Sequence, residues 1–151
     1  MKGGVSIYRR RGATFLERFD DTVEGVSVKV TAEAAELDAS TPREIGERVL
    51  IELGKTHGGL PPLRGAEIDR LPKSRIPSLA GLASWRTFLR GATRVTVVRI
   101  DDGLLELRPF INEGPTEGFR LSVAGVDRIQ GGDPVALGEA IERAFAQAVP
   151  W

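Results

Sequence analysis

The sequence predicts an α+β domain built from two similar halves, and a repeated helical phrase is the main reason. TPREIGERVLIEL, residues 41–53, returns 92 residues later as DPVALGEAIERAF, residues 133–145. Each copy begins with a capping residue and Pro, and then places its large apolar residues on one face of a helix. Each copy also carries a mid-helix Gly, which costs about 1 kcal/mol relative to Ala. We therefore expect Gly46 and Gly138 to serve close packing, with each helix backbone lying against a sheet.

Short strand patterns precede each helix. β-branched and alternating residues mark the strands, and Asp101-Asp102-Gly103 is a hairpin turn signal. The expected strands are 5–10, 14–19, 26–30 and 34–38 in the first half, and 94–100, 104–110, 118–123 and 126–130 in the second. Each half is about four antiparallel strands and one helix. We expect two antiparallel sheets that pack on each other about an approximate two-fold axis.

The length of 151 residues suits one domain, which we place at 1–151. The halves, about 5–54 and 94–148, are joined by an irregular Pro-rich linker, 55–83, and a short amphipathic helix, 84–92. A long irregular segment is either a structural crossover or part of a binding surface. In the short helix, Trp85 and Phe88 are expected to fill the core between the halves; an exposed aromatic patch is the alternative.

The composition excludes several classes of protein. Lys+Arg and Asp+Glu both number 21, so the basic excess of a dedicated nucleic-acid binder is missing. There is no Cys, which excludes disulfides and thiol chemistry. No apolar run approaches the roughly 20 residues of a membrane span, and residues 1–12 lack the apolar region of a secretory signal. We expect a soluble, cytoplasmic protein.

Catalytic motifs are missing from the sequence. His57, the single histidine, lies in a Gly-rich loop with no nucleophile motif or second metal ligand to accompany it. The LGKT at 53–56 ends a helix, whereas a phosphate-binding loop opens one, and the required upstream Gly is Val49. We expect no catalytic residues, no metal, no cofactor and no enzyme activity.

Carboxylates gather in the first half of the chain. Their turn positions suggest exposure, so they form either a solvated face or an acidic patch that meets a basic partner. The group consists of Glu17, Asp20, Asp21 and Glu24, supported by Glu33, Glu36 and Asp38.

A series of motifs resembles one family over roughly residues 5–148. SIYRRRG at 6–12 is followed by S/T-P-x-x-I/L-G-E at a helix start, and SWRTFLRGA at 84–92 runs into V-x-V-x-x-x-D-D-G. GFRLSV at 118–123 then leads to the second helix. The series resembles the CdiI immunity proteins of contact-dependent growth inhibition systems.

The resemblance implies a binding function. Such proteins bind the C-terminal toxin domain of a CdiA-type effector and neutralise it in the cytoplasm of the producing cell. The toxins are often nucleases, whose basic substrate grooves would attract an acidic inhibitor. On that basis the seven carboxylates named above are the expected toxin-binding residues.

Two other functions remain open. The two-half architecture also resembles the Whirly arrangement, which binds single-stranded nucleic acid, but aromatic residues are only 6% of the chain. Arg9, Arg10 and Arg11 either contact phosphate or guard an exposed hairpin edge. An enzyme would instead need a deep pocket with convergent polar groups. Trp151 either docks on the core or stands free for a partner.

Overall fold

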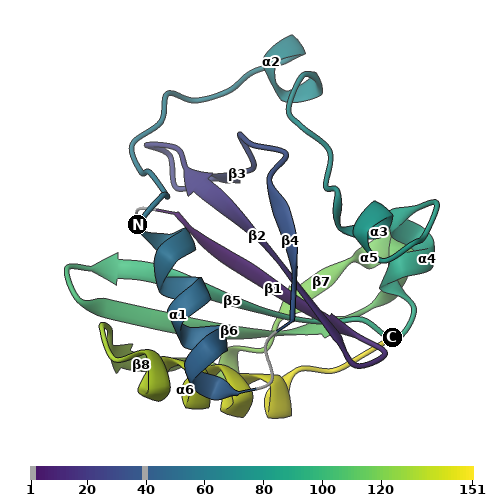
Figure 1. Cartoon of the computed structure of the whole chain (residues 1–151). Coiled ribbons are helices and arrows are strands. Elements are labelled where there is room, and N and C mark those ends of the chain that lie inside the picture. The colour runs from purple at the N-terminus through teal and green to yellow at the C-terminus, as the bar shows by residue number, and fades with distance from the viewer. Residues whose placement is uncertain (1–2, 39–40) are drawn as a thin grey trace.

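In the computed structural model, which describes residues 3–38 and 41–151, eight strands form one continuous antiparallel sheet (Figure 1). The strand order is β3-β2-β1-β5-β6-β7, with β4 also pairing with β2 and β8 also pairing with β6. The first-half strands are β1 (Gly4–Arg10), β2 (Ala13–Asp21), β3 (Ser27–Val28) and β4 (Ala34–Leu37). The second-half strands are β5 (Thr93–Asp101), β6 (Leu104–Asn112), β7 (Phe119–Leu121) and β8 (Asp127–Gln130). All eight lie where the sequence predicted strands.

The helices comprise two long elements and several single turns. The long helices are α1 (Pro42–Leu53) and α6 (Pro134–Gln147). The short ones are α2 (Ala66–Asp69), α3 (Ile76–Leu79), α4 (Trp85–Leu89) and α5 (Gly114–Glu117), with a 3₁₀ turn at Val123–Gly125. α4 confirms the predicted short helix, whereas α2 and α3 are turns of helix within a linker that we expected to be irregular.

The two halves repeat the same connectivity, which confirms the α+β fold class. β1 pairs with β5 at the centre, and each is flanked by its own hairpin partner, β2 or β6. The expectation of two packed sheets is corrected, because the halves join edge to edge. Ile7 lies opposite Val95 and Gly4 opposite Val98, so the first strand of each half satisfies the open backbone edge of the other.

One face of the sheet packs on both long helices. The predicted helical stripes are confirmed, because Ile45, Val49, Leu53, Leu137 and Ile141 are all buried. They meet alternate strand residues in a single core, to which the strands contribute Val5, Ile7, Leu16, Val95, Val97, Leu105 and Leu107. The caps are also as expected: Thr41 accepts from the Glu44 N–H and Asp133 from the Val135 N–H.

The twin glycines contact the opposite helix, which corrects the expectation that each lies against a sheet. A Cβ placed on Gly46 would stand 1.8 Å from the Pro134 carbonyl oxygen. A Cβ placed on Gly138 would stand 1.8 Å from the Pro42 carbonyl oxygen. Each glycine therefore admits the first turn of the other helix, and α1 and α6 cross at backbone contact distance.

The other face of the sheet carries a smaller aromatic core that joins the two halves. Phe88 of α4 is fully buried and makes an edge-on contact with Phe15, ring centroids 5.7 Å apart. Trp85 is half-buried and meets Tyr8 edge-on at 5.4 Å. This confirms that Trp85 and Phe88 fill the core between the halves.

Among the described residues, no helix combines the length and the apolar character needed to cross a membrane.

We expect Gly46→Ala to lower the free energy of unfolding by about 3 kcal/mol, because the added methyl group would overlap a backbone carbonyl that cannot rotate away. Gly138→Ala should behave in the same way. Gly54→Ala is the matched control, because its φ of −62° is helical and its Cβ would meet no atom closer than 3.3 Å. Urea denaturation measures all three; equal stability of the three variants would contradict the crossing described here.

Candidate interaction surface

The acidic cluster predicted from the sequence divides into a buried part and an exposed part. Glu17, Asp20 and Asp21 are buried, with relative exposures of 9%, 2% and 0%. The expectation that they lie in exposed turns is therefore corrected. β2 continues to Asp21, two residues beyond its predicted end, and the linker then covers the end of that strand.

Asp20 and the backbone of Asp21 fasten the entry of the linker, and the Asp21 carboxylate holds the residues beside it. The Asp21 carboxylate accepts from the Gly3 N–H and the Ser27 hydroxyl, each at 2.8 Å. Asp20 Oδ1 accepts from the His57 N–H at 2.6 Å. The backbone adds to this, because Asp21 N–H donates to the His57 carbonyl and Leu60 N–H donates to the Asp21 carbonyl, each at 3.1 Å. His57 contributes to these contacts through its backbone.

Glu17 fastens the exit of the linker. Its Oε2 accepts from the Ser74 hydroxyl at 2.9 Å and lies 3.8 Å from the Lys29 ammonium nitrogen. Burial lowers the pKa of Lys29 from its ordinary value, and the Glu17 charge opposes that effect. The carboxylates of Asp20 and Glu17 and the backbone of Asp21, all on β2, thus hold both ends of the same excursion of the chain.

The exposed acids are Glu24, Glu33, Glu36 and Asp38. Glu33 Oε2 lies 2.6 Å from Arg18 Nη1, and that guanidinium also reaches the buried Glu52 at 3.3 Å. Glu36 lies within β4, which ends just before Asp38. Glu24 lies apart from them, in the turn between β2 and β3. The seven predicted residues therefore do not form one acidic patch.

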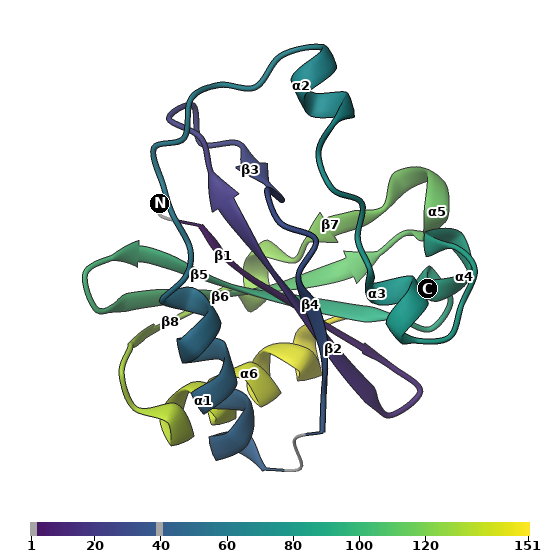
Figure 2. The same ribbon diagram turned by 45° about the horizontal axis from the view of Figure 1, so that its top comes forward.

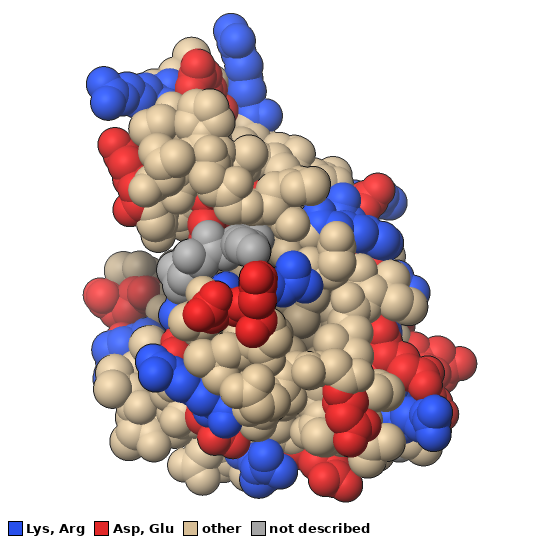
Figure 3. All heavy atoms as spheres, turned by 90° about the vertical axis from the view of Figure 1, so that its left-hand side faces the viewer, with Lys and Arg blue, Asp and Glu red and all other residues tan. Residues whose placement is uncertain are grey.

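Between its two fastenings the linker rises above the end of β2 and carries α2 at its far end (Figures 1 and 2). We define the linker lobe as residues 60–73 together with residues 22–28, which form the β2–β3 turn and β3. Its apolar side chains are exposed: Val23 by 65%, Val26 by 54% and Ile68 by 52%. Figure 3 shows this end of the molecule as a largely uncharged surface with charged groups at its margin.

A groove of about 280 Å³ runs through the linker lobe. Its apolar walls come from Val26, Val28, Leu63, Ile68 and Leu71. Our sequence reasoning did not locate this surface, although it left a binding role for the linker open. A sequence signal for this surface lies in LPPLRGAEIDRLP, residues 60–72. This segment is rich in large apolar residues although its prolines and glycine predict a loop.

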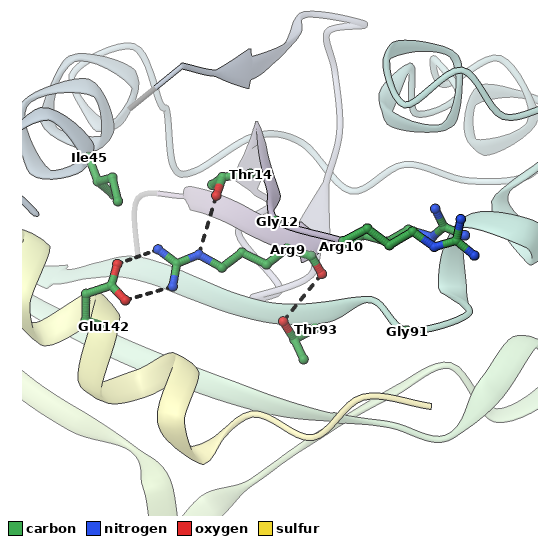
Figure 4. Close-up of a pocket in the computed structure, with 9 residues that line it drawn as sticks. Arg9, Arg10, Gly12, Thr14, Ile45, Gly91, Thr93 and Glu142 are labelled. Atoms are coloured by element: carbon green, nitrogen blue, oxygen red, sulfur yellow. Dashed lines mark hydrogen bonds and ion pairs between the residues drawn. The ribbon is translucent and has the colours of Figure 1, made fainter. Parts of the chain in front are cut away.

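A second pocket, of about 400 Å³, lies beside the β1–β2 hairpin (Figure 4). On its floor the Arg9 guanidinium forms a two-pronged pair with Glu142 of α6, with Nη1 to Oε2 at 2.8 Å. The same guanidinium lies 4.2 Å from the centre of the Phe145 ring. Arg10 points away from Glu142 and donates to the Arg90 carbonyl at 3.0 Å. Arg9 and Arg10 are thus engaged in internal contacts, whereas Arg11 is exposed.

The hydrogen bonds from Arg9 lower the pKa of Glu142 below its ordinary value, against a smaller opposing effect of burial. In the described part of the chain, no three His, Cys, Asp or Glu side chains gather as a metal site would require.

No family model and no curated protein matches this chain. The solved structures that share its fold over almost the whole length include the following two. A protein of unknown function from Neisseria meningitidis is 12% identical and superposes with a TM-score of 0.75. The alignment covers 97% of this chain and 94% of the other. A chain of the CdiA-CT/CdiI toxin and immunity complex from Yersinia pseudotuberculosis is 13% identical and superposes with a TM-score of 0.69. The alignment covers 98% of each chain. At these identities the likeness is one of fold.

We expect Asp21→Asn to lower the free energy of unfolding by about 2 kcal/mol, because the amide replaces a buried charged acceptor of two hydrogen bonds. Glu24→Gln, a few residues away and exposed, should change stability by less than about 0.5 kcal/mol. Thermal denaturation compares the two. Equal midpoints would mean that the Asp21 carboxylate does not stabilise the fold through Gly3 and Ser27.

Glu142→Gln should destabilise the protein more at pH 7 than at pH 3. A carboxyl group whose pKa is lowered by folding contributes stability above its unfolded pKa, and loses that contribution as the pH falls through the folded pKa. Because Glu142 is 42% exposed, the effect should be only about 0.5–1 kcal/mol. Urea denaturation at both pH values measures it; a pH-independent difference would argue against the ion pair as its source.

Proposed function

We propose that this chain is an immunity protein, which binds a toxin domain and thereby blocks its activity. The observation that carries the proposal is the end-to-end likeness to a component of a toxin and immunity complex. The motif order read from the sequence supports the same function independently. The proposed partner is the C-terminal toxin domain of a CdiA-type effector, bound in the cytoplasm of the producing cell.

The surface has features that suit protein binding. A stable inhibitor complex buries about 1,200–2,000 Å² in total, with an apolar centre and a polar rim. Exposed apolar side chains on the linker lobe and exposed carboxylates on β4 and the β2–β3 turn are the kinds of group that such an interface uses. We propose that Glu24, Glu33, Glu36 and Asp38 face a basic, nuclease-type toxin. Glu17, Asp20 and Asp21 act indirectly, by holding the surface in place.

Binding of single-stranded nucleic acid is less well supported. That function needs exposed aromatic rings along a basic groove. Here Tyr8, Phe15 and Phe88 are packed inside the aromatic core, and Arg9 is paired with Glu142. The whole chain has equal numbers of basic and acidic residues, which also disfavours binding of nucleic acid.

Co-expression with the toxin domain encoded beside this chain tests the proposal. Cells that carry the toxin alone should stop growing, whereas cells that carry both should grow and yield a stable complex on size-exclusion chromatography. Continued toxicity without a complex would rule out the immunity function. Binding of single-stranded DNA or RNA that weakens steeply with salt would favour the alternative.

The double change Glu36→Lys and Asp38→Lys should slow association with the toxin about tenfold at low salt and flatten its salt dependence, because the two charges would repel a basic partner. Glu117→Lys with Glu139→Lys alters net charge equally on other elements and should leave the rate nearly unchanged. Stopped-flow measurements compare the pairs. Equal association rates for both double variants would mean that Glu36 and Asp38 do not face the toxin.

A further inference from the structure

We propose that the linker lobe is the docking surface for the toxin, and that its groove receives a large apolar side chain of the toxin flanked by a basic one. This inference rests on the proposed function and adds to it where the partner binds and by what chemistry. The lobe is residues 60–73 with residues 22–28, as defined above.

The lobe contributes little to the fold itself. None of the residues 60–73 belongs to either hydrophobic core, and α2 has no buried residue. Ordering each residue of such a segment costs about 1 kcal/mol or more of backbone entropy. The fold nevertheless fastens the segment at both ends, through Asp20 and Asp21 at the entry and Glu17 at the exit. An ordered excursion that packs so little of its own apolar surface is better explained by a partner than by stability.

The apolar side chains of the lobe are concentrated and form walls. Val23, Val26 and Ile68 are each more than half exposed, and Val26 and Ile68 line the same groove. A groove of about 280 Å³ is large enough for one aromatic or long aliphatic side chain. Exposed apolar surface with a polar rim marks interaction sites in soluble proteins, and a central apolar anchor in a pocket supplies most of the affinity of many complexes.

The charge of Glu24 favours a basic residue of the toxin next to the apolar anchoring side chain. Two charged residues line the groove. Lys29 lies 3.8 Å from Glu17, whereas Glu24 makes no ion pair with any residue that the structure describes. A Lys or Arg beside the anchoring side chain would pair with it as the anchor enters the groove. The basic surface that a nuclease-type toxin needs for its substrate supplies such residues. A second copy of this chain that paired groove to groove about a two-fold axis would instead bring a second Glu24 toward the first.

The test measures the affinity of purified variants for the toxin domain encoded beside this chain, isolated from the co-expressed complex in denaturant and refolded. Ile68→Asp and Val26→Asp should each weaken binding at least about 30-fold, the effect expected of a central apolar anchor site. Ile51→Asp and Val123→Asp are matched controls, because these residues are 57% and 76% exposed on other elements. They should bind within about twofold of the wild type. Glu24→Lys should weaken binding and reduce its salt dependence.

The outcomes separate this inference from the proposed function. If the wild-type chain does not bind the toxin, the immunity function fails. If the wild type binds and both lobe variants bind equally well, the function stands and the docking surface lies elsewhere. A wild-type dimer that Ile68→Asp converts to a monomer would identify a second copy as the occupant and overturn the inference. Unchanged melting temperatures of the lobe variants show that any lost affinity is local.

Discussion

The close crossing of α1 and α6 is the contact on which the rest of the architecture depends. Gly46 admits the Pro134 carbonyl and Gly138 admits the Pro42 carbonyl, so the two helices can lie together on one face of the sheet. Side chains at these positions would separate the helices and open the core beneath them. The same reciprocity explains why the helical phrase is repeated, because each copy supplies both the glycine and the proline turn that the other copy needs.

The helices cover one face of the sheet and the aromatic core covers the other. Polar residues of β2 form hydrogen bonds to segments outside these two cores. Glu17, Asp20 and Asp21 lie on β2, and they accept hydrogen bonds from Ser74, from the His57 N–H and from the Ser27 hydroxyl, respectively. A buried carboxylate is costly unless donors surround it, so each of these residues fixes the position of its donors. The rigid sheet is thereby connected to a loop that carries exposed apolar groups.

Local signals predicted the elements well, and long-range contacts explain what they missed. Thr41-Pro42 and Asp133-Pro134 marked both helix starts, and the Asp101-Asp102-Gly103 turn marked a hairpin, because each acts within a few residues. The joining of the halves through β1 and β5 depends on pairing across about 90 residues, and nothing in either strand specifies it. The burial of Asp20 likewise depends on His57, 37 residues away. The role of the acidic residues in binding stays a prediction, and three of them were assigned to the wrong surroundings, because Glu17, Asp20 and Asp21 are buried.

The fastening of the linker at its two ends has a consequence for divergence. Residues 61–73 can change in sequence, or even in length, while the contacts of Glu17, Asp20 and Asp21 keep the ends of the segment in place. Such changes leave the helix crossing and both cores untouched, so their stability cost is small. The scaffold thus separates the residues that determine folding from those of the proposed docking surface. A lineage could acquire a new binding specificity by exchanging one short segment and keeping the rest of the molecule.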